Sequence, residues 1–90
     1  MIVEINRTGK RVNLLKTNKA LCPFVTEIAK QYGYFNVSVL DIENYKSIEW
    51  EGIEFNRLLR KENTLYRFNN WIGEYPFTGI EIEEIGTIII

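Results

Sequence analysis

The chain has 90 residues, of which 46% are apolar and 26% charged, and its formal net charge is −1. This length fits one globular domain over residues 1–90, because two halves would each bury too little apolar surface to offset the entropy of ordering the chain. Its basic residues are interspersed with acidic and polar ones, so the chain lacks the basic stripe of a nucleic-acid binder, and no apolar run approaches the roughly 18 residues of a membrane span.

The residue types that are missing narrow the chemistry further. The chain contains no histidine, one cysteine and a single aspartate, Asp41. Zinc sites and Ser-His-Asp or Cys-His constellations depend on these residue types, so we expect no metal and no other cofactor. One cysteine cannot form an intramolecular disulfide, and the first ten residues lack the apolar segment of a secretory signal. We therefore expect a cytoplasmic protein.

Two runs rich in β-forming residues open the chain. Ile2–Ile5 and Arg11–Leu15 are separated by polar residues and Gly9, which are residue types that favour turns. The sequence predicts a β-hairpin here, in which Val3 and Ile5 face the core and the residue between them faces solvent.

The next segment has apolar residues at helical spacing. Pro23 fits the first helical position, and Gly33 fits the position just past the end. The sequence therefore predicts one long helix over about residues 21–32. Its buried stripe would consist of Leu21, Phe24, Val25, Ile28, Ala29 and Tyr32.

A strand should follow this helix, because Phe35, Val37 and Val39 alternate with polar residues. Residues 48–55 fit either a hairpin or the start of a helix. Helical periodicity continues beyond them, and it favours a second, shorter helix over about residues 56–65.

The last third of the chain divides into two parts. The aromatic-rich stretch RFNNWIGEYPFTG is interrupted by Gly73, Pro76 and Gly79, which predicts an irregular loop. Residues 80–90 alternate isoleucine with glutamate and predict a strand with a bulge at Glu84. Together the elements predict an α+β fold, a mostly antiparallel sheet of four to five strands with both helices packed on one face.

Cys22 stands directly before Pro23 at the predicted helix start, where the helix dipole favours a thiolate. The order of strand, Cys-Pro, helix and strand in VNLLKTNKALCPFVTEIAKQYG and FNVSVLDIE resembles the first β-α-β unit of glutaredoxins, over about residues 11–43. The resemblance implies that Cys22 is the nucleophile of a monothiol redox mechanism, since Val25 stands in place of the family's second cysteine. Pro76 would then match the family's cis-proline. The competing interpretation is that this lone cysteine only caps or packs a helix.

Four aromatic residues lie in the least periodic parts of the chain: Trp50, Trp71, Tyr75 and Phe77. Loops expose such side chains, and aromatic residues are the usual anchors of protein interfaces. The alternative is that they fill the core of a small domain.

Glu81 and Glu83 belong to an acidic run near the C-terminus. One interpretation is a rim that steers a basic partner by long-range attraction, and the other is an ordinary solvated strand face.

With catalytic and metal-binding motifs absent, we expect a non-enzymatic binding or inhibitory module that acts by occupying another protein. The alternative function is the glutaredoxin-like redox protein that uses Cys22. A second copy of the chain, pairing through the C-terminal strand, is a further candidate partner. The high content of isoleucine, asparagine, lysine and glutamate fits an AT-rich genome such as that of a phage or mobile element.

Overall fold

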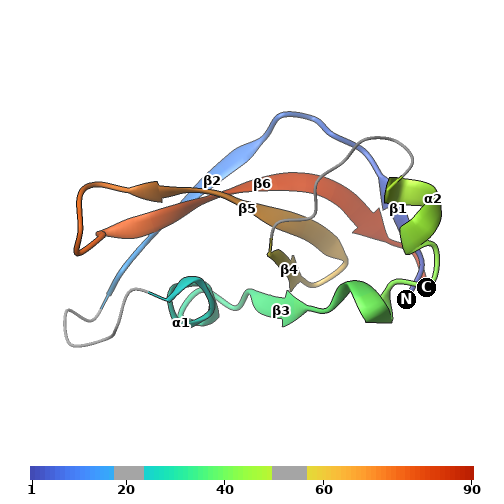
Figure 1. Cartoon of the computed structure of the whole chain (residues 1–90), viewed down its shortest axis with the longest axis horizontal. Helices are drawn as coiled ribbons and strands as arrows, with labels where there is room; N and C mark the ends of the chain where they lie inside the picture. The colour runs from blue at the N-terminus through green and yellow to red at the C-terminus, as the bar shows by residue number, and fades with distance from the viewer. Residues whose placement is uncertain (18–23, 50–56) are drawn as a thin grey trace.

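An antiparallel sheet of six strands dominates the part of the chain that the computed structural model describes, residues 1–17, 24–49 and 57–90 (Figure 1). Two short helices and one 3-10 turn accompany it. In chain order the elements are β1 (Val3–Ile5), β2 (Arg11–Leu15), α1 (Val25–Lys30), β3 (Phe35–Val37), η1 (Val39–Asp41), α2 (Tyr45–Glu49), β4 (Leu58–Lys61), β5 (Thr64–Ile72) and β6 (Gly79–Ile88). The predicted combination of one long helix and a second shorter helix is therefore wrong.

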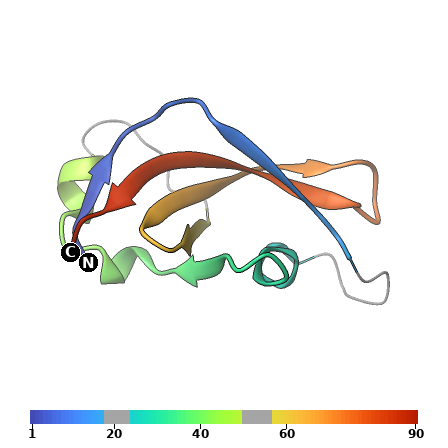
Figure 2. The same ribbon diagram turned by 180° about the vertical axis from the view of Figure 1, so that it is seen from behind.

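The first two strands do not form the predicted hairpin. The sheet order is β1-β6-β5-β4-β3, and β2 also pairs with β6, so β1 and β2 lie one after the other along the same edge of β6 (Figures 1 and 2). The chain leaves β6 after the bond from Asn6 N to Ile85 O and returns at the bond from Glu84 N to Lys10 O. Gly9, at φ +79°, lies in this short excursion, and it does not reverse the chain. The alternation of apolar and polar residues identified both strands, but it did not show that both pair with β6.

Helix α1 is shorter than predicted. Val25, Ile28 and Ala29 are buried as expected, but Phe24 precedes the helix and is exposed, and Tyr32 is also exposed. The C-terminal end follows the prediction, because the chain closes with a bond from Tyr34 N to Ala29 O around Gly33 at φ +83°. The predicted helical residues 21–23 lie outside the described residues.

The predicted second helix is a β-hairpin. Strand β4 pairs with β5, with Lys61 opposite Thr64, and Glu62 closes the two-residue turn at φ +55°. Neighbours in a strand point to opposite faces, so Leu58 and Leu59 are both buried because both faces of the sheet are covered. Such adjacent apolar pairs imitate helical periodicity. Residues 48–55, which fit either a hairpin or the start of a helix, fall mostly outside the described residues. Helix α2, which begins before them, was not predicted.

About half of the stretch predicted as an irregular loop is strand, since β5 extends to Ile72 and β6 begins at Gly79. The predicted bulge near Glu84 is confirmed, because the register shifts from Tyr66 opposite Glu84 to Leu65 opposite Gly86. Strand β6 lies between β5 and the β1–β2 edge. Its described length therefore has no free edge for pairing with a second copy.

Two apolar clusters form the core on opposite faces of the sheet. Leu59 belongs to the cluster that α1 covers, and its neighbour Leu58 belongs to the cluster that α2 and the residues before it cover. The first cluster consists of Leu14, Val25, Ile28, Ala29, Tyr34, Leu59, Ile80 and Ile82. The second consists of Val3, Val37, Ile42, Ile48, Leu58, Leu65, Ile85 and Ile88.

The β-α-β unit implied by the resemblance to glutaredoxins is not present. Its two strands would be parallel neighbours, whereas β2 pairs with β6 and β3 pairs with β4, at opposite edges of an antiparallel sheet. Cys22 itself lies outside the described residues. No helix in the described ranges is long and apolar enough to cross a membrane.

Candidate functional site

The hairpin formed by β5 and β6 ends in a loop of residues 73–78. Figures 1 and 2 both place this loop at one end of the molecule's long axis, which extends 39 Å. The N–H and the hydroxyl of Thr78 both donate to the carbonyl of Ile72, at 3.0 and 3.2 Å, and Gly73 supplies a φ of +82°. The Tyr75–Pro76 peptide bond is cis. The two hydrogen bonds of Thr78 close the loop.

Four aromatic rings form a continuous series from the core to this loop. Phe68 contacts Trp71 edge-on, with ring centroids 5.5 Å apart, and Trp71 stacks on Phe77 at 4.6 Å and 19°. Tyr75 contacts the edge of Phe77 at 6.0 Å and 89°. We call Trp71, Tyr75 and Phe77 the aromatic tip. The structure thus brings together three of the residues selected from the sequence.

Three rings of this series are half-buried, and the outermost ring is exposed. Phe68 and Trp71 pack against the core cluster under α1, Phe77 is half-buried, and Tyr75 is 80% exposed. The rings of Phe68 and Trp71 hold those of Phe77 and Tyr75 in place. Tyr75 is the ring that is exposed enough to enter a pocket on another molecule. Glu74, also exposed, is the charged neighbour of that ring.

The predicted acidic residues are not free at this end. Glu83 is only 5% exposed, and its carboxylate accepts hydrogen bonds from Arg7 Nη2 at 2.8 and 3.4 Å and lies 3.6 Å from Arg67 Nε. Glu81 accepts a hydrogen bond from Asn69 and pairs with Arg11 at 3.8 Å. These carboxylates do not form an accessible rim, because they hold the N-terminal segment against the sheet through Arg7 and Arg11. Trp50, the remaining predicted contact, lies outside the described residues.

The register of the sheet explains why the ion pairs of Arg11 and Arg67 were missed. Glu83 lies opposite both Arg11 and Arg67 in neighbouring strands. Cross-strand neighbours interact directly, but strand pairing brings them together from distant parts of the chain. Local spacing carries no signal for that arrangement.

A second aromatic pair lies between β5 and the residues that follow α1. Tyr34 and Tyr66 meet edge-on at 5.0 Å, and Lys61 Nζ lies 5.0 Å from the centre of the Tyr34 ring. Burial raises the pKa of the Tyr66 phenol, and the neighbouring Tyr34 and Glu84 raise it further. Tyr34 is buried in the core cluster, so this pair stabilises the fold and is not a docking surface.

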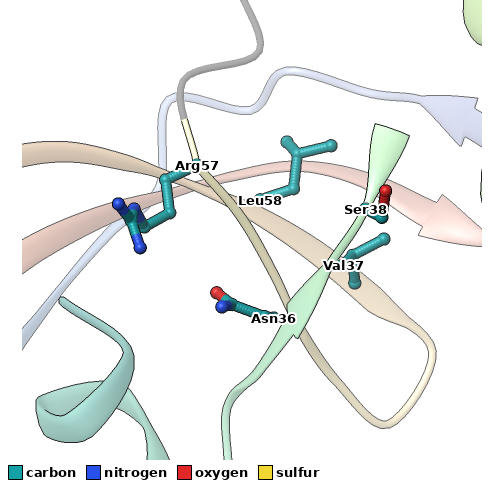
Figure 3. A pocket seen from close by; sticks show the side chains of 5 residues that line it. All are labelled: Asn36, Val37, Ser38, Arg57 and Leu58. Carbon is teal, nitrogen blue, oxygen red and sulfur yellow. The ribbon is translucent and has the colours of Figure 1, made fainter. Parts of the chain in front are cut away.

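A hollow of about 400 Å³ lies beside β3 (Figure 3). The polar groups at this place are already engaged, because Asn36 Nδ2 donates to Thr26 Oγ1 at 3.0 Å and Arg57 reaches the same oxygen at 3.4 Å. The hollow is lined by Asn36, Val37, Ser38, Arg57 and Leu58. Arg57 is the one charged side chain among these described residues, so they offer no acid–base pair. Among the described residues there is also no group of three or more potential metal ligands.

Comparison with known protein families, with curated proteins and with solved structures found no match. The site itself therefore carries the evidence on function.

Proposed function

We propose that this chain is a small non-enzymatic module that binds another protein through the aromatic tip. The observation that carries the proposal is Tyr75, which is 80% exposed and rests on the stacked Trp71 and Phe77 rings at the end of a hairpin. An exposed aromatic ring held at a protruding position is the kind of side chain that anchors protein interfaces.

The structure of the aromatic tip favours binding, because its backbone and most of its side chains are already ordered before a partner binds. The loop is closed by Thr78, and Phe77 is fixed by its stack on Trp71. A preorganised contact loses less conformational entropy on association than a flexible one, so more of the contact energy appears as affinity. A partner would offer an apolar pocket for Tyr75. Occupying that pocket would block other ligands, which is how a module of this size would inhibit.

Affinity capture from the native host lysate tests the proposal, with Tyr75→Ser as the key variant. Loss of an interface anchor costs about 2 kcal/mol or more, which is about a 30-fold loss of affinity. We expect Tyr75→Ser to melt like the parent and to lose a partner protein that the parent retains. Trp71 is not suitable for this test, because it packs against the core and its truncation would also destabilise the fold.

Phe35→Ser is the matched control. Phe35 is also an exposed aromatic residue, at 55%, but it lies in β3, at the edge of the sheet away from the hairpin tip. We expect this variant to capture the same protein as the parent. Equal capture by Tyr75→Ser and the parent, or equal loss in both variants, would contradict docking through the tip.

A further inference from the structure

The edges of the sheet are protected unequally. At β1 the carboxamide of Asn44 covers the outer edge, since its Oδ1 accepts from Val3 N at 3.1 Å and its Nδ2 donates to Val3 O at 2.7 Å. This side chain takes the place that a neighbouring strand would occupy. Open edges invite pairing with other chains, and proteins commonly block them in this way.

Within residues 1–17, 24–49 and 57–90, strand β2 has no such cover along most of its length. The bonds from Lys16 N to Thr78 O and from Glu84 N to Lys10 O show that the even-numbered residues of this segment bond to β6. Alternate residues of an antiparallel strand direct their backbone groups to opposite sides. The N–H and C=O groups of Arg11, Asn13 and Leu15 therefore point away from the sheet.

One of these outward groups has a partner within the described residues. The hydroxyl of Tyr32 donates to Leu15 O at 2.8 Å, at the end of the strand nearest α1. The outward groups of Arg11 and Asn13 have none there, and both residues are exposed. The opposite edge of the sheet, β3, has only three residues. Strand β2, with five residues, is therefore a longer open edge than β3.

The side chains along β2 define what would fit beside it. Strand alternation places the even-numbered side chains of this segment on one face. On that face the apolar side chains of Val12 and Leu14 lie between the cations Lys10 and Lys16. Val12 packs on the core cluster to which Leu14 belongs. A neighbouring strand that extends this face needs apolar residues opposite the centre and acidic residues opposite both ends.

We propose that the β2 edge accepts an extended segment of a partner protein as an added antiparallel strand. The segment carries acidic, apolar, apolar and acidic residues at alternate positions. This inference deepens the proposed function and rests on it for its biological meaning, because it adds a second contact to that made by the aromatic tip. Main-chain hydrogen bonds supply the affinity in this mode of recognition, and the alternate side chains supply the specificity.

A second copy of the chain fits this edge less well. The two-fold antiparallel pairing that uses all the outward groups is centred on Asn13, and it places Lys10 of one copy opposite Lys16 of the other. Like charges directly opposite each other destabilise a strand pair. Charge complementarity therefore favours an acidic segment.

The probe for this proposal is the peptide acetyl-Glu-Thr-Val-Thr-Val-Thr-Glu-amide, added to the isotope-labelled full chain and followed by NMR. We expect saturable shifts at the amides of Arg11, Asn13 and Leu15, and at least about tenfold slower hydrogen exchange at these amides in the complex. In the free chain they should exchange faster than their even-numbered neighbours. Shifts confined to another surface, or no saturable binding up to about 1 mM peptide, would overturn the proposal.

Two matched peptides test the geometry and the charge. N-methylation of the central threonine removes a backbone donor that faces β2, whereas N-methylation of a valine removes one that faces away. We expect about tenfold weaker binding for the first peptide and parental binding for the second. Replacing both glutamates by lysine should also weaken binding about tenfold at low salt. Equal affinities within either comparison would overturn the corresponding part of the proposal.

One further variant separates this proposal from the proposed function. Tyr75→Ser should bind the peptide like the parent, because the tip does not take part in the strand pairing. Failure of the peptide to bind, with capture still dependent on Tyr75, would refute the added strand alone. Peptide binding by a chain whose capture does not depend on Tyr75 would refute the tip alone.

Discussion

Replacing Glu83 by glutamine tests the buried ion pair that ties the N-terminal segment to the sheet. The Glu83 side chain is 6% exposed, whereas those of Arg7 and Arg67 are 43% and 21% exposed. Breaking a fully buried pair costs about 3–5 kcal/mol, and an exposed pair contributes less than about 1 kcal/mol. Since water reaches Arg7, we expect an intermediate loss of about 2 kcal/mol in the free energy of unfolding.

Urea denaturation measures this loss. With a slope of about 1–2 kcal/mol per molar urea, the midpoint should fall by about 1–2 M. The control is Glu84→Gln, in the next residue of the same strand, where we expect a change within about 0.5 kcal/mol. If Glu83→Gln also stays within about 0.5 kcal/mol of the parent, the carboxylate is accessible and the reasoning about the ion pair is refuted.

Three further predictions concern the core, the β1 edge and the pH dependence of stability. Ile28→Asp should unfold the chain, because Ile28 is fully buried and the new charge has no partner; circular dichroism showing a parent-like melt would contradict this. Asn44→Ala should lower the free energy of unfolding by about 2 kcal/mol, since it removes two hydrogen bonds to Val3, and an unchanged exchange rate of the Val3 amide would count against that role. The raised pKa of Tyr66 means that the folded chain keeps the phenol proton when the unfolded chain loses it, so stability should fall as pH rises above about 10. Tyr66→Phe should reduce that fall, and an identical pH profile would show that another group causes it.

Alternation along the sequence identified strands better than it identified their partners. The bounds of β2 match the predicted Arg11–Leu15 run, the predicted N-terminal strand contains β1, and the predicted strand over residues 80–90 coincides with β6 as far as Ile88. Alternation reports which face of a strand is buried, but not which strand lies beside it. The predicted hairpin was therefore wrong, because β6 is long enough to pair with both N-terminal segments.

The error at residues 56–65 has a different cause. Leu58 and Leu59 face different apolar clusters, so β4 shows no alternation that would mark it as a strand. Its turn relies on Glu62 at positive φ, a conformation for which glycine or asparagine is the usual signal. Helix-forming residues in the same stretch then favoured the wrong element.

The candidate site was foreseeable only in part. The interruption of periodicity around Gly73 and Pro76 correctly indicated a loop near Tyr75 and Phe77. The stack of Trp71 on Phe77 depends on the hairpin, and the open edge of β2 depends on the partner of β6; neither can be read from local spacing.

The most direct test of the aromatic tip is photo-crosslinking from position 75 in the native host. Benzoylphenylalanine in place of Tyr75 keeps an aromatic ring at the exposed end of the hairpin, and the same substitution at Phe35 is the control. Docking through the tip predicts a single crosslinked partner from position 75 that position 35 does not give. Crosslinks from position 35 alone, or none from position 75 when capture shows a bound partner, would contradict it.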